Sequence, residues 1–159
     1  MQMPRRALHA LVFLATTLIG IAAPQAQATS NDTATAGGLT AYLGVMPSEI
    51  VKGHPSSHPE GAMHGGAPRD AHEYHIVVAI FDSASGTRVS DATVTAKVSG
   101  LGLSGPEKPL EPMAIADTIT YGGFFELPGA DRYTVRVTIK RPSSQAPVVL
   151  EFQYDHRIQ

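Results

Sequence analysis

The sequence contains no cysteine, and only 16% of its 159 residues are charged. Without cysteine the chain cannot form a disulfide in an oxidising compartment, and a thiolate metal site is excluded. The hydrophobic core must therefore stabilise the fold alone, which about 130 residues can do. A formal net charge of −2 without a basic stripe argues against a nucleic-acid-binding protein.

Long apolar runs are absent after residue 28, so no later stretch could cross a bilayer. The first 28 residues start with the positive pair Arg5-Arg6, continue with a mostly apolar run over 7–23 and end in Ala-Gln-Ala. This pattern predicts a cleaved signal peptide over residues 1–28. A transmembrane anchor is the weaker alternative, because polar residues interrupt the run. We therefore expect an exported, periplasmic protein.

Short segments with β-strand patterning follow residue 38. Strands are expected, from alternating or continuous apolar residues, over 39 to about 47, 74–81, 92–98, 133–140 and 148–154. Residues 110–121 are expected to add one or two short strands, and residues 99–109, rich in Gly, Pro and Ser, to form a loop. About seven short strands without a helical period predict an all-β fold, an immunoglobulin-like β-sandwich over residues 38–159.

Two local features qualify this architecture. Residues 29–37 are polar, small and aperiodic, which predicts a disordered leader before the domain. Tyr133 follows shortly after the Pro128-Gly129 turn, an arrangement similar to the tyrosine corner of immunoglobulin-like domains. An ordinary core tyrosine is the alternative interpretation.

The residues with metal-binding chemistry gather in one segment, residues 53–75. It holds five of the seven histidines, together with Glu60 and Met63: His54, His58, His64, His72 and His75. Imidazole, thioether and carboxylate are the transition-metal ligands left to a protein without cysteine, and their mixture suits copper or iron. The His/Met combination favours copper. The alternative is a solvated, flexible polar loop.

Spacing limits which of these side chains one ion can bind. In an extended chain alternate side chains share a face, so His58 and Glu60 stand side by side about 7 Å apart. In an extended chain His64 lies about 20 Å from His58. It can join the other two side chains only if the chain bends at the glycines of this segment. His75 falls inside an expected strand, where we interpret it as a packed histidine rather than a ligand.

Three motifs resemble the periplasmic Fe2+ transport family, whose members are encoded beside bacterial iron permeases and bind copper. Residues 58–64 (HPEGAMH) resemble its H-x-E-x-x-x-H run, and Glu111-Pro112-Met113 resembles its M-P-M segment, with Glu111 in place of the first methionine. Tyr121-Gly122, the LPG sequence at 127–129 and Tyr133 resemble its passage into the penultimate strand. The resemblance covers most of residues 38–155.

The resemblance implies a dimeric immunoglobulin-like sandwich that holds copper near the dimer interface. His58, Glu60 and Met113 match the ligand positions of the family. Two ligands do not match: Thr120 stands where the family has a histidine, and residues 141–147 are too few for the insert that carries another. The replacement candidates in this chain are His54, His64, His72, Met63 and His156.

These residues lead to a hypothesis of function. We expect an exported, non-enzymatic protein that binds copper, iron or both and assists high-affinity iron uptake through a membrane permease. The alternatives are a periplasmic copper-holding chaperone and a structural sandwich without a specific metal site. A redox enzyme is disfavoured, because the sequence has no blue-copper cysteine, no second cofactor motif and no arrangement for acid–base catalysis.

Overall fold

The computed structural model describes residues 32–52, 72–115 and 117–157. In this part of the chain, eight antiparallel strands and one five-residue helix follow one another: β1 (Thr33–Ala36), β2 (Leu39–Pro47), α1 (Ser48–Lys52), β3 (Glu73–Asp82), β4 (Thr93–Gly100), β5 (Leu103–Ile115), β6 (Thr118–Glu126), β7 (Asp131–Lys140) and β8 (Val148–His156). The predicted all-β fold is confirmed. None of the described helical residues belongs to a helix long and apolar enough to span a membrane. The expected signal peptide, residues 1–28, lies outside the described residues.

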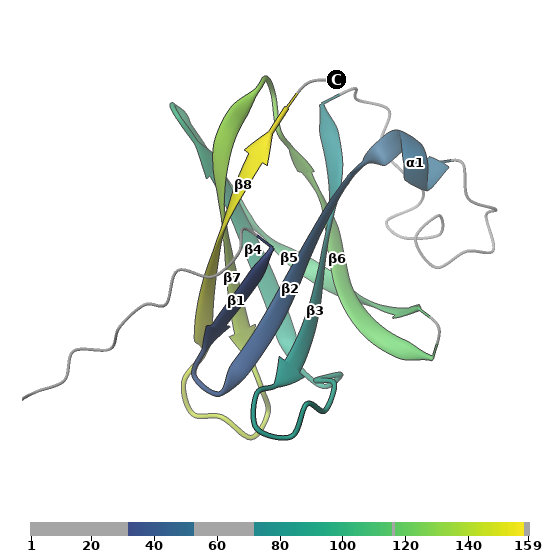
Figure 1. Cartoon of the computed structure of the whole chain (residues 1–159), viewed down its shortest axis with the longest axis vertical. Coiled ribbons are helices and arrows are strands. Elements are labelled where there is room, and N and C mark those ends of the chain that lie inside the picture. The colour runs from purple at the N-terminus through teal and green to yellow at the C-terminus, as the bar shows by residue number, and fades with distance from the viewer. Residues whose placement is uncertain (1–31, 53–71, 116, 158–159) are drawn as a thin grey trace, which may run out of the picture.

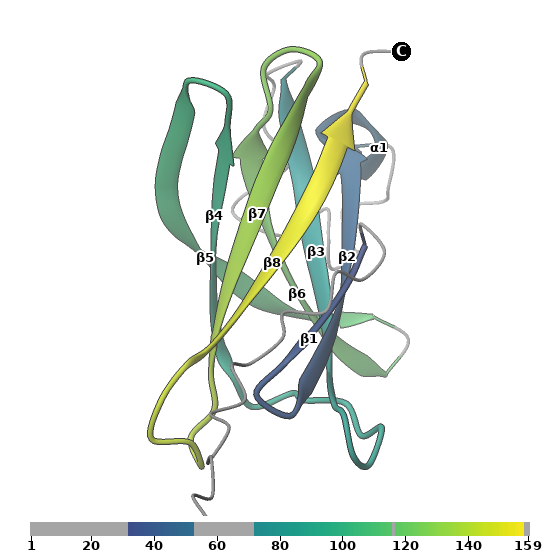
Figure 2. The ribbon, with the colours of Figure 1, turned by 60° about the vertical axis from the view of Figure 1, so that its left-hand side comes forward.

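The strands form two layers, which Figures 1 and 2 show from two directions. The hydrogen-bonded order is β1-β2-β3-β6-β5-β4-β7-β8. Strand β5 belongs to both layers, because its first half pairs with β4 and its residues 111–115 pair with β6. Strands β2, β3, β6 and β5 therefore face β4, β7 and β8, which is the strand arrangement of a constant-type immunoglobulin domain. Strand β1 lies against β8, so the sheet nearly closes.

The core fills the space between the layers. Strand β7 contributes every second residue, and its inward side chains from Tyr133 to Ile139 are at most 1% exposed. They pack in one cluster with inward residues of β3, such as Ile76 and Val78. The outward positions of β7 carry polar side chains, and Arg136 donates to Glu151 of β8. The alternation expected over residues 133–140 is thus confirmed as a half-buried strand.

Two segments differ from the sequence prediction. Residues 99–109 were expected to form a loop, but β5 begins at Leu103. Each half of β5 is hydrogen-bonded to one neighbouring strand only, so prolines, which lack an N–H group, are tolerated in it. Thr33–Ala36, expected in a disordered leader, forms β1. Gly37 and Gly38, with φ of 56° and 76°, make the two-residue hairpin turn that joins β1 to β2.

Tyr133 forms the tyrosine corner. Its side chain is 1% exposed, and its hydroxyl donates a 2.5 Å hydrogen bond to the carbonyl of Pro128. Burial raises the pKa of this hydroxyl, which favours the protonated form that donates the bond. The bond ties the start of β7 to the turn that precedes it. The tyrosine-corner interpretation is confirmed over the ordinary core tyrosine.

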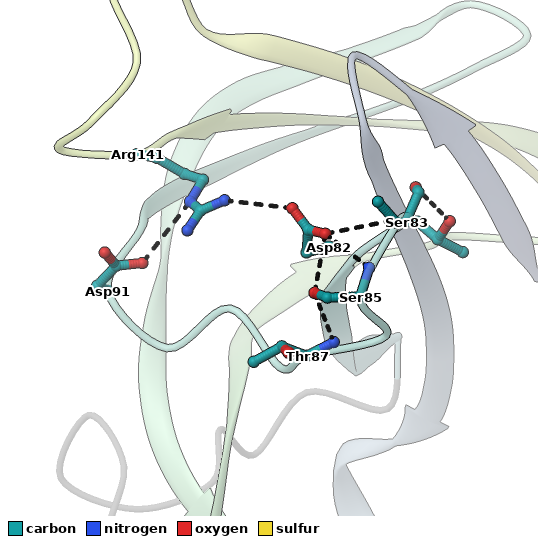
Figure 3. A network of polar contacts seen from close by, with 8 residues as sticks. Asp82, Ser83, Ser85, Thr87, Asp91 and Arg141 are labelled. Atoms are coloured by element: carbon teal, nitrogen blue, oxygen red, sulfur yellow. Dashed lines mark hydrogen bonds and ion pairs between the residues drawn. The ribbon is translucent and has the colours of Figure 1, made fainter.

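A polar network lies at the end of the sandwich opposite the tyrosine corner (Figure 3). Asp82, at the end of β3, accepts hydrogen bonds from the backbone N–H of Ser85 at 3.0 Å and from its hydroxyl at 2.9 Å. These bonds, led by that of the backbone N–H, lower the pKa of the Asp82 carboxyl. The Arg141 guanidinium lies 3.8 Å from Asp82 and 3.9 Å from Asp91. It therefore links the end of β7 to the turn between β3 and β4.

The tyrosine corner gives a stability prediction. Tyr133→Phe removes the hydroxyl and leaves the Pro128 carbonyl without its donor, so we expect the free energy of unfolding to fall by about 1 kcal/mol. Urea unfolding followed by circular dichroism measures the change. Tyr154→Phe is the matched control, because this half-buried hydroxyl makes no hydrogen bond within the described part of the chain. Equal losses in the two variants would contradict the role of the corner.

Candidate metal site

The sequence-predicted ligands divide between described and undescribed residues. Five of them lie outside the described residues and stay predictions: His54, His58, Glu60, Met63 and His64. His72 is exposed just before β3, and its backbone carbonyl accepts a 2.9 Å hydrogen bond from the Leu127 N–H. Met113, in the second half of β5, is only 3% exposed. Within the described residues, Met113 and the replacement candidate His156 are therefore the predicted ligands that are buried.

Met113 points away from the core. Strand β6 is buried on both faces over residues 120–125. Tyr121 belongs to the core cluster, so the alternating positions Thr120 and Gly122 face outward. Met113 stands directly opposite Thr120 in the β5–β6 ladder and shares its outward face. A second buried cluster thus lies on the outer side of the layer that contains β6.

His75 reaches the same cluster from β3. It pairs with Phe124 of β6, is fully buried, and stacks on the Phe124 ring with centroids 4.8 Å apart. A Cβ atom on Gly122 would lie 2.5 Å from the Met113 Cε and 2.8 Å from the His75 Nε2. Thioether and imidazole therefore converge over the one outward position of β6 that has no side chain. Gly122 is required there because any larger residue would fill the space between them.

This arrangement suits copper chemically. A thioether stabilises Cu(I), an imidazole binds both copper oxidation states, and both donors are uncharged when they bind. Stacking on Phe124 and burial in the sheet restrict His75 to one orientation before any ion binds. No cluster of three or more His, Asp or Glu side chains suitable for a metal occurs among the described residues. Within the described residues, His75 and Met113 are the candidate donors that approach each other closely.

The interpretation of His75 as a packed histidine is confirmed, because the side chain is fully buried and stacks on Phe124. Sequence reasoning did not predict its close approach to Met113. The strand period assigns His75 to the outward face of β3, but it does not tell which other strands are adjacent. The missed signal is the Gly122-Gly123 pair, because glycine inside a buried strand marks a place where another group approaches closely. Combined with the family resemblance at Met113, this pair could have indicated a site over β6.

His156, one of the replacement candidates, lies elsewhere. Its ring is 4% exposed, with Nδ1 2.7 Å from the Gly129 carbonyl oxygen. It packs edge-on against Tyr74, with ring centroids 4.6 Å apart. Tyr74 packs against the core and directly precedes His75, so their side chains leave β3 on opposite faces. His156 therefore does not join Met113 and His75 in one site.

Comparison with known proteins finds similarity in structure alone. No known sequence family and no curated protein matches the chain. A DUF4426 family protein (PA0388) from Pseudomonas aeruginosa PAO1 has a TM-score of 0.59 at 18% identity, over 80% of this chain and 94% of that one. A copper-bound variant of FetP from uropathogenic Escherichia coli strain F11 has a TM-score of 0.57 at 15% identity, over 78% and 93%. The 'as isolated' form of strain F11 FetP, expressed recombinantly in E. coli BL21(DE3), gives 0.55 at 17% identity, over 79% and 94%. At these identities the likeness shows a shared fold.

The close approach over Gly122 can be tested by filling it. In Gly122→Ala the new methyl group would overlap the Met113 methyl and the His75 imidazole, so we expect the free energy of unfolding to fall by about 1–3 kcal/mol. The displaced imidazole should change its NMR resonances.

Gly123→Ala is the matched control on the core side of the same strand, where the added Cβ would lie 3.1 Å from the Leu110 Cδ2. This variant should lose stability without moving the His75 resonances. Unchanged His75 resonances in Gly122→Ala would show that the two side chains do not meet there.

Proposed function

We propose that this protein is an exported, periplasmic copper-binding protein that assists high-affinity iron uptake through a membrane permease. The observation that carries the proposal is the convergence of Met113 and His75 over Gly122. The two side chains come from different strands on either side of β6, so a hydrogen-bonded sheet fixes their separation. Copper is the metal that this combination of thioether and imidazole suits best.

The other donors of the proposed site come from residues 53–71. The sequence places His54, His58, Glu60 and His64 there, between α1 and the start of β3, in a segment that ends close to His75 in sequence. Helix α1 itself lies against β2 and β3. A carboxylate from Glu60 would also suit iron, which is harder than copper. We include iron as a second metal of the protein on this ground.

The cellular setting is the finer part of the proposal. The predicted signal peptide supports a periplasmic location, and the fold shared with a copper-bound FetP supports copper as the metal. The resemblance of the three sequence motifs supports a membrane iron permease and a second copy of this chain as partners. No reaction is proposed for the site, and we propose a metal carrier rather than an enzyme.

A copper-holding chaperone is the second candidate function. It is favoured by the same pair, His75 and Met113, because a thioether is a ligand of copper rather than of iron. The two functions share the site and differ in the partner that receives the metal.

The copper site gives the first functional prediction. We expect the mature protein to bind one copper ion tightly, and Met113→Leu or His75→Gln to weaken its affinity by at least about tenfold, as the loss of a donor does. Competition titrations with a copper chelator and electron paramagnetic resonance measure the change. Met113→Leu nearly conserves volume, so the fold should remain.

His156→Gln serves as the control, because it removes a buried histidine on the core side and should leave the copper affinity unchanged. Several weak copper ions that are indifferent to Met113→Leu would mean that the histidine-rich tract binds metal without a specific site. Imidazole binds when neutral, so affinity should fall as the pH drops through about 6.5. An affinity that stays flat from about pH 7.5 to about pH 5 would exclude histidine ligands.

The cellular role gives a separate prediction. Cells that lack the protein should grow poorly when iron is chelated, because the proposed function supplies iron to the permease. The unmodified gene should restore growth, and Met113→Leu should not. A mutant that grows normally without iron, but is sensitive to added copper, would replace the iron-uptake role with the chaperone role.

A further inference from the structure

A carboxylate stands next to the His75/Met113 pair. Glu111 is directly opposite Gly122 in the β5–β6 ladder. Opposite residues of antiparallel strands share a face and have Cβ atoms about 4.5–5.5 Å apart. The Glu111 side chain therefore starts about 5 Å from the point where the Met113 methyl and the His75 Nε2 converge.

The backbone fixes this placement from two directions. Glu111 precedes Met113 by two residues in β5, so the period of the strand puts both on the outward face. The register of β6 puts Gly122 opposite Glu111 and Thr120 opposite Met113. Glu111 is half-buried, and its side chain is long enough to reach toward the Met113 methyl and the His75 Nε2 over Gly122.

We propose that Glu111 is a carboxylate ligand of the same copper ion, and that it allows the site to hold Cu(II) as well as Cu(I). This inference rests on the proposed copper-binding function. It assigns a donor of each kind to the site: nitrogen from His75, sulfur from Met113 and oxygen from Glu111. The oxygen donor is the hardest of the three and favours the more highly charged ion.

The charge of the ligands also favours Cu(II) over Cu(I). His75 and Met113 are neutral ligands, so in their buried surroundings they leave the whole charge of the ion uncompensated. One carboxylate cancels the charge of Cu(I) and halves that of Cu(II). Because the uncompensated cost grows with charge, Glu111 stabilises Cu(II) more than Cu(I). It lowers the reduction potential of the bound copper.

Glu111→Gln tests this assignment, because it keeps the size of the side chain and removes its charge. We expect the Cu(II) affinity of the mature protein to fall by at least about tenfold and the Cu(I) affinity to change by less than about threefold. A tenfold change in the ratio raises the reduction potential by about 59 mV. The electron paramagnetic resonance spectrum of Cu(II) should also change, since an oxygen donor is lost.

Glu126→Gln is the matched control. Glu126 lies on the same strand and the same face as Gly122, about 13 Å further along, and is exposed. This variant loses the same charge but should leave both affinities and the spectrum unchanged. Glu111→Met supplies a second thioether and should bind Cu(I) more tightly and Cu(II) more weakly than the unmodified protein.

The outcomes separate the inference from the function on which it rests. If the unmodified protein binds one tight copper ion and Glu111→Gln matches it in both affinities, Glu111 is not a ligand while the proposed function stands. If Glu126→Gln weakens Cu(II) as much as Glu111→Gln, the effect is long-range and the assignment fails. If the unmodified protein binds no copper tightly, the proposed function fails and the inference fails with it.

Discussion

Strand β6 is buried on both of its faces, and this constraint shapes the core and the candidate site together. The inward side chains of Tyr121 and Phe125 fill the space between the layers. The outward face of β6 is shielded from solvent as well. Phe124 stacks on His75 there, and Gly122 leaves room for the side chains of His75 and Met113. A strand with one solvent-exposed face would need packing partners on its other face only. Residues 120–125 of β6 therefore stabilise the sandwich and also bring His75 and Met113, the two side chains of the candidate site, close together.

Much of this fold could be predicted from local pattern. The alternation in β7 and β8 is visible because one face of each strand packs in the core and the other faces solvent. The tyrosine corner was visible because it joins residues only five apart. The second half of β5 falls in the expected strand region 110–121, but its first half was not visible, because its glycine and prolines are typical of loops and are tolerated only where one side needs no hydrogen bond. Strand β1 is too short and polar to show a period.

The site was less accessible to sequence reasoning than the fold. Met113 was found through its motif, which is a local feature. His75 lies 38 residues before it, and only the register of three strands shows that the two side chains approach each other at Gly122. Thr120 illustrates the limit of carrying a motif over: it stands opposite Met113 where the resemblance expects a histidine, and the nearby imidazole belongs to His75 of another strand.

The path of β5 through both layers affects how the protein unfolds. In most sandwiches the two sheets are joined by loops, and one sheet can in principle open while the other keeps its hydrogen bonds. Here the same continuous strand completes both sheets, and it passes from one to the other between Leu110 and Glu111. Separating the two layers at β5 therefore breaks its hydrogen bonds to β4 or to β6. This continuity favours cooperative, all-or-none unfolding.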